Sequence, residues 1–139
     1  MTIDAPATPD IPAGFERRTR RSPLTDPWEP LYTKTTDKAV IVGLRLAKPH
    51  TNGRGLIHGG LIAALSDNAM GHSCAYVMGG VSSLVTISLA VDFIGNAEIG
   101  QWLAIESHCP TFAVPTKSTA RLIVTNDLPV SQPVACAQL

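Results

Sequence analysis

The chain has 139 residues, with 11 basic side chains from Lys and Arg balanced by 11 acidic side chains from Asp and Glu. This length predicts a single domain that can bury a hydrophobic core, and a hydrophobic content of 45% excludes a disordered chain. A net charge of zero argues against a dedicated nucleic-acid-binding protein, which needs a basic surface. The charges are unevenly placed, because Asp67 is the only charged side chain among the 37 residues from Gly55 to Val91.

The sequence predicts neither a membrane span nor a secretory signal. Its longest uncharged stretch, residues 68–91, is interrupted by histidine, glycine and serine. The first twelve residues lack the basic start and apolar core of a secretory signal. The chain has three widely spaced cysteines, Cys74, Cys109 and Cys136. An odd number of separated cysteines is typical of reduced thiols, so we expect a cytoplasmic protein. With no predicted span, we expect no membrane partner.

Residues 1–30 are predicted to form an N-terminal arm that is partly disordered. Six of the eleven prolines lie there, and residues 1–12 are rich in proline, alanine and threonine. The basic stretch from Gly14 to Arg21 is compatible with one helical turn that Pro23 would end. Its arginines are interpreted as a solvated basic patch, with a docking surface for the phosphates of a nucleotide-tailed substrate as the alternative. Trp28 is expected to hold the arm against the body of the domain.

The body of the domain, residues 31–139, is predicted to begin with a β-hairpin. Residues 31–34 and 39–46 flank a polar turn, and apolar residues alternate along the second strand. A loop rich in turn residues follows at positions 49–57. From Gly59 the apolar spacing predicts a helix of about eighteen residues that ends at Gly79 and Gly80. Since this helix is apolar on nearly every face, we expect it to be buried on nearly every side.

Four strands and no further helix are predicted downstream, at residues 83–93, 102–108, 117–126 and 134–137. Successive strands without helical crossovers form antiparallel sheets. Two strands, one apolar helix and four more strands therefore predict an α+β fold in which the sheet wraps around the central helix.

The segment from Asn52 to Gly60 contains the densest group of turn residues in the chain. Glycines at a helix start allow a ligand to approach backbone N–H groups that have no partner within the helix. Together with the helix dipole, these groups favour a developing oxyanion. The alternative is a tight loop whose glycines only satisfy turn geometry, and the pattern by itself favours that alternative.

Asp67 is the second candidate site. An ionised carboxylate in a buried helix costs several kcal/mol unless it is paired, and no basic residue lies within four positions of it. The alternative is a solvent-facing stripe formed with neighbouring polar residues. Eight residues separate Asp67 from Gly59, which is about 12 Å along a helix and too far for both to act on one carbonyl carbon. If the two cooperate, two chains must pair so that the helix start of one faces Asp67 of the other.

Metal and cofactor chemistry are not expected. The four histidines, at positions 50, 58, 72 and 108, form no pair with metal-ligand spacing. The chain contains no serine nucleophile elbow, and Cys74 is interpreted as a buried structural thiol.

Taken together, these residues resemble the hot-dog-fold acyl-CoA thioesterases of the phenylacetyl-CoA thioesterase (PaaI-like) type. The resemblance extends from about Leu31 to the C-terminus and also includes the strand at residues 85–93. Two stretches depart from the family pattern: the first 30 residues, which lie outside the resemblance, and residues 109–115. The motif that carries the resemblance is Asn52-x-x-Gly55-x-x-His58-Gly59-Gly60, followed by Asp67 and Gly71.

The resemblance implies a role for each matching residue. The Gly59 N–H would polarise the thioester carbonyl with help from Asn52, while His58 would lie near the sulfur or orient the loop. Asp67 of the partner chain would activate or orient the attacking water, or attack directly, with Thr86 as a second hydrogen-bonding group. The substrate-binding residues would be Gly60 and Arg54.

The implied function is hydrolysis of an acyl-CoA thioester, with aryl and medium-chain acyl groups as candidates, by a homodimer or homotetramer with active sites at the subunit interface. A non-catalytic hot-dog protein that binds or senses acyl-CoA is the alternative. A hydratase or dehydratase of the same fold uses a different histidine and acid pattern, which this sequence lacks.

Overall fold

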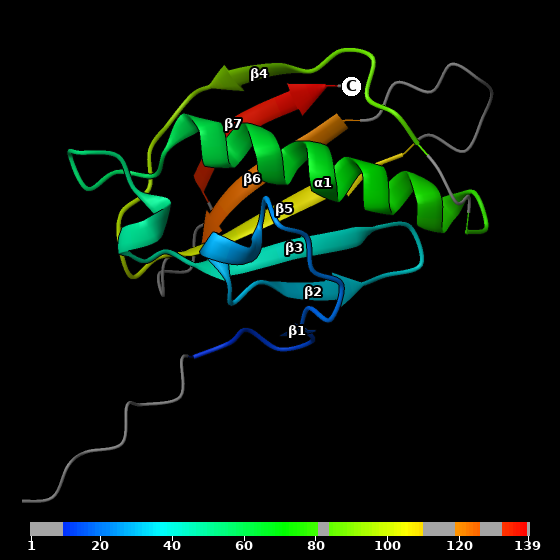
Figure 1. Cartoon of the computed structure of the whole chain (residues 1–139), viewed down its shortest axis with the longest axis horizontal. Coiled ribbons are helices and arrows are strands. Elements are labelled where there is room, and N and C mark those ends of the chain that lie inside the picture. The colour runs from blue at the N-terminus through cyan, green and yellow to red at the C-terminus, as the bar shows by residue number, and fades with distance from the viewer. Residues whose placement is uncertain (1–9, 81–83, 110–118, 126–131, 139) are drawn as a thin grey trace, which may run out of the picture.

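The structure is a computed structural model that describes residues 10–80 and 84–109, and the backbone of residues 119–125 and 132–138 (Figure 1). In this part of the chain, seven antiparallel strands form one sheet in the order β1-β2-β3-β5-β6-β7-β4. Helix α1, Gly59–Val77, lies across one face of the sheet, and two short 3-10 helices, η1 and η2, precede it. The predicted α+β class is confirmed. The other elements are β1 (Glu16–Arg17), η1 (Asp26–Trp28), β2 (Tyr32–Thr35), β3 (Val40–Arg45), η2 (Lys48–His50), β4 (Ala90–Phe93), β5 (Trp102–His108), β6 (Thr119–Thr125) and β7 (Gln132–Gln138).

The predicted hairpin, the central helix and the strand at 102–108 are confirmed. Thr33 of β2 lies opposite Val42 of β3, as a hairpin requires. Helix α1 ends where the glycines were expected to end it, because Gly79 and Gly80 adopt φ angles of 79° and 86° that other residues rarely take. The Gly80 N–H then donates to the carbonyl of Ala75 at 2.8 Å.

The core lies between α1 and the inner face of the sheet. Successive side chains of a strand point to opposite faces, so Leu103 and Ile105 of β5 face α1, whereas Trp102 and Ala104 lie on the outer face. Burial of each large apolar side chain contributes roughly 1.5–3 kcal/mol. The helix contributes five apolar side chains that are at most 2% exposed: Leu61, Ile62, Leu65, Ala69 and Met70.

The prediction that α1 is buried on nearly every side is wrong for the single chain. The sheet covers one face of the helix only, so Tyr76 remains 47% exposed, and Met78, just beyond the last helical residue, is 43% exposed. Asp67 and Asn68 lie on the partly exposed side.

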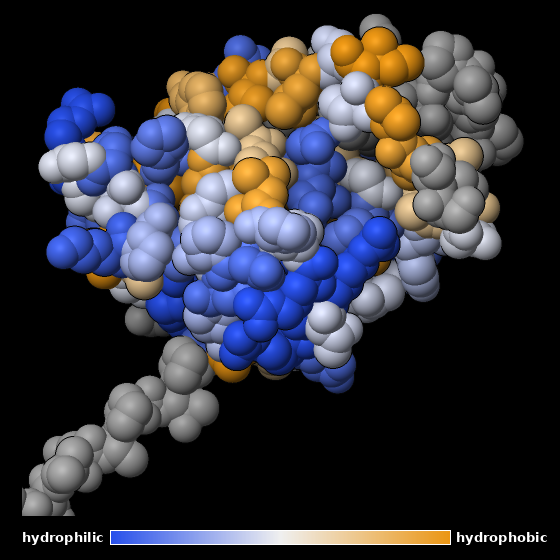
Figure 2. All heavy atoms as spheres, in the orientation of Figure 1, coloured by the Kyte–Doolittle hydropathy of each residue, from blue (hydrophilic) through white to orange (hydrophobic). Residues whose placement is uncertain are grey.

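The long strand predicted at 83–93 is shorter in the structure, where β4 covers only Ala90–Phe93. Strand β4 pairs with β7, and Ala90 lies opposite Gln138 at the end of β7, so residues 84–89 have no partner strand in the described part of the chain. Val85 and Ile87 are consequently 84% and 94% exposed. Figure 2 shows hydrophobic side chains gathered along this edge of the molecule. Residue 83 and the ends of the strand predicted at 117–126 lie outside the described residues.

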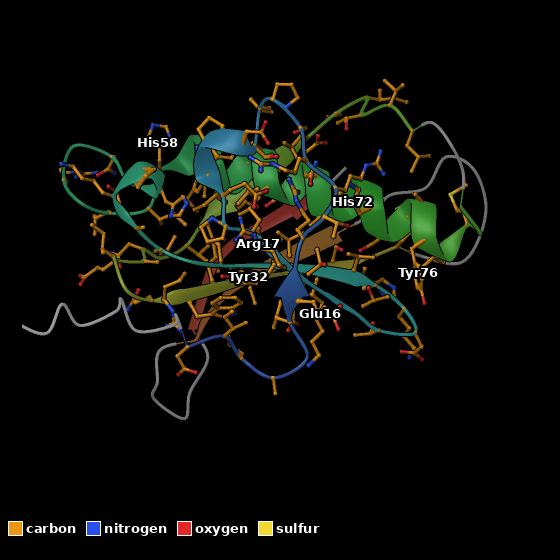
Figure 3. The ribbon with its side chains drawn as sticks, turned by 60° about the horizontal axis from the view of Figure 1, so that its bottom comes forward. Glu16, Arg17, Tyr32, His58, His72 and Tyr76 are labelled. Atoms are coloured by element: carbon orange, nitrogen blue, oxygen red, sulfur yellow. The ribbon has the colours of Figure 1, made fainter. Side chains whose placement is uncertain are left out.

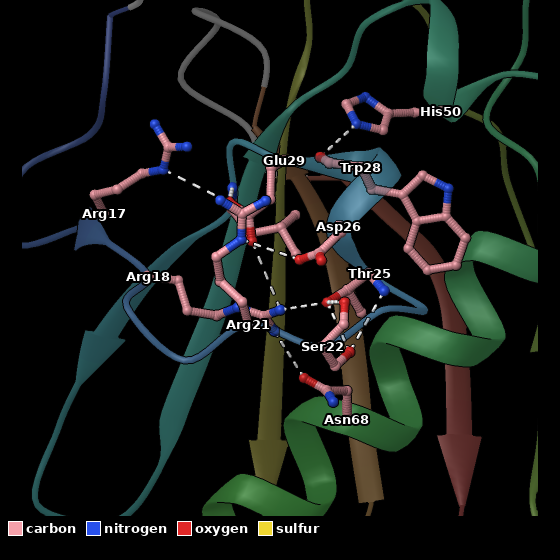
Figure 4. A network of polar contacts seen from close by, with 11 residues as sticks. Arg17, Arg18, Arg21, Ser22, Thr25, Asp26, Trp28, Glu29, His50 and Asn68 are labelled. Carbon is pink, nitrogen blue, oxygen red and sulfur yellow. Dashed lines mark hydrogen bonds and ion pairs between the residues drawn. The ribbon is translucent and has the colours of Figure 1, made fainter.

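The helical turn predicted between Gly14 and Arg21 is wrong. Residues 16 and 17 form β1, which pairs with β2 and extends the sheet. The solvated-patch interpretation also fails for Arg18, which is 6% exposed and donates hydrogen bonds to Thr25 at 2.6 Å and Asn68 of α1 at 2.9 Å (Figure 4). Its guanidinium also lies 3.7 Å from the buried carboxylate of Glu29.

Trp28 packs against the main core, which confirms that it holds the N-terminal segment to the domain. The disorder predicted for the start of the chain falls on residues 1–9, which lie outside the described residues.

We predict that Gly43→Ala destabilises the fold by about 1–3 kcal/mol, because the strand places Gly43 beneath two aromatic rings. A Cβ atom there would overlap the ring of Trp102 and lie 2.7 Å from the ring of Phe15. Gly53→Ala is the matched control, since its new Cβ would meet no atom within 4 Å. Urea unfolding of both variants measures the difference, and equal stabilities would contradict this packing.

Candidate active site

The loop that precedes α1 is closed by the side chain of Asn52. Its Oδ1 accepts hydrogen bonds from the N–H groups of Arg54 at 2.9 Å and Leu56 at 3.3 Å. Its own N–H donates to the carbonyl of Leu56 at 2.8 Å. Asn52 therefore uses its carbonyl oxygen to hold the loop and keeps its side-chain NH₂ as a donor.

His50 anchors this loop to the N-terminal segment, a role that the sequence did not suggest. The imidazole is 3% exposed; Nδ1 accepts from the Ala47 N–H at 2.9 Å, and Nε2 lies 2.9 Å from the carbonyl of Trp28. Because Nδ1 accepts, the proton is on Nε2 and donates to that carbonyl. The backbone carbonyl of His50 also accepts from the N–H of His58 at 3.0 Å. In the sequence, the local signals for this role are Pro49 and the position of His50 two residues before Asn52.

His58 caps the N-terminus of α1 and lies at the end of the helix opposite His72 and Tyr76 (Figure 3). Its Nδ1 accepts from the Gly60 N–H at 2.8 Å, so that N–H is already satisfied. The Gly59 N–H has no acceptor among the described residues and points out of the first turn, where the helix dipole favours negative charge. A Cβ atom on Gly59 would lie 3.2 Å from the ring of Phe93, so glycine permits a close approach here.

Asp67 lies on the partly exposed face of α1, where Thr86 orients its carboxylate. The hydroxyl of Thr86 donates to Oδ1 at 2.5 Å, while Oδ2 has no partner among the described residues. Thr86 belongs to the exposed segment that leads into β4. The next residue, Asn68, is fixed by the hydrogen bond from Arg18.

The predicted residues thus form two groups on one helix. Asn52, His58, Gly59 and Gly60 surround its N-terminus, and exposed Arg54 lies on the adjoining loop. Asp67 and Thr86 form the second group, about 12 Å further along the helix axis. Within one chain, the free N–H of Gly59 and the carboxylate of Asp67 therefore do not converge on one reacting atom.

Cys74, which the sequence indicates to be a structural thiol, is buried at 7% exposure. Its neighbour Cys109, just beyond β5, is also buried, and burial together with a hydrogen bond to Cys74 raises the pKa of the Cys109 thiol to about 12. The Cys109 thiol is therefore protonated at neutral pH, and the burial of Cys74 agrees with the structural role expected for it.

No three His, Cys, Asp or Glu side chains lie close enough to hold a metal ion in the described ranges. Among the described helices, none has the length and apolar character needed to cross a membrane.

Comparison with known proteins relates this architecture to thioesterases. The sequence profile of the Thioesterase superfamily matches residues 54–110. Over 100 residues, the chain is 33% identical to the Pseudomonas aeruginosa protein named "Putative esterase PA0474", with 71% of this chain and 75% of that protein covered.

Two solved structures share the fold. The structure of smu.793 from Streptococcus mutans, bound to acetyl CoA, is 26% identical, with a TM-score of 0.62 over 80% of this chain and 86% of that one. The E. coli PaaI protein from the phenylacetic acid degradation operon is 19% identical, with a TM-score of 0.60 over 78% and 79% of the two chains.

One central helix packed against an antiparallel sheet, together with these matches, defines a hot-dog fold. The chain belongs to the thioesterase superfamily. It is a thioester hydrolase, as the resemblance implied.

We predict that His72 contributes to acid sensitivity of the fold. Burial lowers the pKa of His72, and the nearby Arg20 and Arg18 guanidiniums lower it further. Below the ordinary value of about 6.5, the unfolded chain therefore binds a proton that the folded chain does not, so stability falls as the pH decreases. His72→Gln should reduce the loss of unfolding free energy between about pH 7.5 and pH 5.5. Urea titrations across that range measure the slope, and a wild-type slope in the variant would contradict the prediction.

Proposed function

We propose that this protein hydrolyses an acyl-CoA thioester to a carboxylic acid and free CoA, without a metal or an organic cofactor. The active site would be shared between two copies of the chain, with the start of α1 from one copy facing Asp67 of the other. The structure of smu.793 with acetyl CoA supports this substrate class. The single observation that carries the proposal is the carboxylate of Asp67, which is oriented by Thr86 and is the only charge in its 37-residue stretch.

Asp67 is suited to activate water. Thr86 occupies Oδ1 and leaves Oδ2 able to accept a proton from a water molecule. The water oxygen would then form a bond to the thioester carbon as its proton moves to Oδ2. When the tetrahedral intermediate collapses, the C–S bond breaks, and the proton held by Asp67 returns to the departing thiolate.

The Gly59 N–H is suited to stabilise the oxyanion of that intermediate. The neighbouring Gly60 N–H is bonded to His58, so Gly59 presents the available donor at the positive end of the helix dipole. The side-chain NH₂ of Asn52 would be a second donor. His58 holds the first turn through Nδ1 and, in its neutral form, carries a proton on Nε2 that could approach the sulfur. We assign substrate contact to Gly60, and phosphate binding to the exposed guanidinium of Arg54.

The proposed dimer is supported by the β4 edge of the sheet, which pairs with no further strand in the described part of the chain. Strand β4 ends the sheet, and edge strands expose N–H and C=O groups that pair readily with another strand. Exposed apolar side chains continue along the same edge, which is typical of a surface that another chain covers. They are Leu84, Val85, Ile87, Phe93 and Ile94, between 46% and 94% exposed. A homodimer formed here, or a tetramer of two such dimers, would bring Thr86 and Asp67 to the interface.

Three finer assignments are part of the same proposal. The motif from Asn52 to Gly60, followed by Asp67, supports the PaaI-like branch and an aryl or medium-chain acyl group. Residues 31–139 would form the thioesterase domain, with residues 1–30 as an N-terminal arm. The odd number of separated cysteines supports a cytoplasmic location.

We predict that Asp67→Asn lowers kcat on the preferred acyl-CoA by about 10²- to 10⁴-fold, because the amide cannot take a proton from water. Asp37→Asn, at an exposed turn, is the matched control and should keep wild-type kcat. Thr86→Val should lose part of the activity that Thr86→Ser retains, since serine keeps the hydroxyl donor. Release of free thiol from acetyl-, hexanoyl- and phenylacetyl-CoA measures these rates. Equal kcat for the wild type and Asp67→Asn would remove Asp67 from the mechanism.

A further inference from the structure

A cavity of about 500 Å³ lies between the N-terminal segment, the β2–β3 hairpin and the C-terminal half of α1. Its volume is within the range of about 300–1,000 Å³ that is typical of small-molecule sites. Figure 3 shows His72 and Tyr76 along this half of the helix, beside β1 and β2. The residues that decide its chemistry are Arg18, Arg20, Val40, His72, Ala75 and Tyr76.

The cavity is distinct from the site around Asp67 and Thr86. Strands β2 and β4 lie toward opposite edges of the sheet, so the hairpin that lines the cavity is remote from the β4 edge. His72 also lies five residues beyond Asp67, which is about 7.5 Å along the helix axis. The mechanism proposed above uses none of the residues that line the cavity.

One end of the cavity is cationic. Arg18 and Arg20 both line it, and no carboxylate does so among the described residues. The Nη atoms of Arg18 donate to Asn68 and Thr25, and Nε is buried without a hydrogen-bond partner in the described chain. Arg20 is exposed and has no ion-pair partner among the described residues, so its planar guanidinium is available.

The acidic side chains near the cavity only partly compensate the positive charge of Arg18 and Arg20. Glu29 lies 3.7 Å from Arg18 but also pairs with Arg17 at 3.6 Å, and Asp26 pairs with Arg21. The two arginines of the cavity act together on the neighbouring imidazole, where they add to burial in lowering the pKa of His72. A bound anion would relieve this repulsion between like charges.

Part of the remaining wall is apolar, beside the polar side chains of Thr19, Thr33 and His72. Val40, Ala75 and the half-exposed ring of Tyr76 provide contact for a hydrocarbon group beside the cationic end. Because the Nη atoms of Arg18 are already bonded, Arg20 offers the one free guanidinium fork, which matches a single planar carboxylate.

We propose that this cavity binds a small organic carboxylate, with its anionic group at Arg18 and Arg20 and its apolar body against Val40, Ala75 and Tyr76. The site goes beyond the proposed hydrolysis and does not depend on it. Carboxylates are also the product class of a thioester hydrolase, so such a site would allow the protein to bind its own product or a related acid.

The test is calorimetric titration of the full chain with hexanoate, hexanamide and inorganic phosphate. We expect binding of hexanoate only. Arg20→Ala should weaken it by about tenfold or more, because a charge-assisted contact is lost. Arg21→Ala is the matched control, since that exposed arginine pairs with Asp26 outside the cavity. Ala75→Leu fills the cavity without changing charge and should also weaken binding.

The NMR titration of the His72 ring locates the bound molecule. Hexanoate should raise the pKa of His72 because its charge offsets those of the two arginines, while the ring signals of His58 stay unchanged. Absence of hexanoate binding, equal binding of hexanamide, binding of phosphate in place of hexanoate, or equal losses in Arg20→Ala and Arg21→Ala would each overturn the proposal.

Discussion

The packing of α1 against the inner face of the sheet fixes the two groups on which the proposed reaction depends most, the Gly59 N–H and the Asp67 carboxylate. Leu61, Leu65 and Ala69 are buried against β3 and β5, so the helix has one orientation and little freedom to slide. Its N-terminus and Asp67 are consequently held about 12 Å apart on one rigid element. Since no bending of the helix brings them together, a site that needs both must take one from a second chain.

Sequence reasoning succeeded where structure is determined locally. The hairpin, α1 and β5 have clear apolar periods and turn residues at their ends, and the contrast between Asp67 and its uncharged surroundings is visible in the sequence itself. It failed where a contact joins distant segments. Burial of Arg18 depends on Asn68, fifty positions away, and the strand predicted at 83–93 needs a partner strand that β7 supplies only from Ala90 onward.

The N-terminal segment contributes to the architecture through the same long-range contacts. It adds β1 to the sheet, places Phe15 against Trp102 on the outer face, and inserts Arg18 between Glu29 and α1. Its partners explain why a basic stretch with no apolar period is nevertheless ordered, since a buried arginine is stable only where its charge is paired and its Nη atoms are hydrogen-bonded. The same segment forms the cationic end of the cavity beside the C-terminal half of α1.

Activity of a purified mixed dimer tests most directly whether the site is shared between two chains. One copy would carry Asp67→Asn and the other Gly59→Val, each under a different affinity tag, and each variant by itself should be inactive. A shared site predicts that the mixed dimer regains about half of the wild-type kcat, because one of its two sites then has both an intact Gly59 and an intact Asp67. Activity no higher than that of the two parent variants would contradict a shared site.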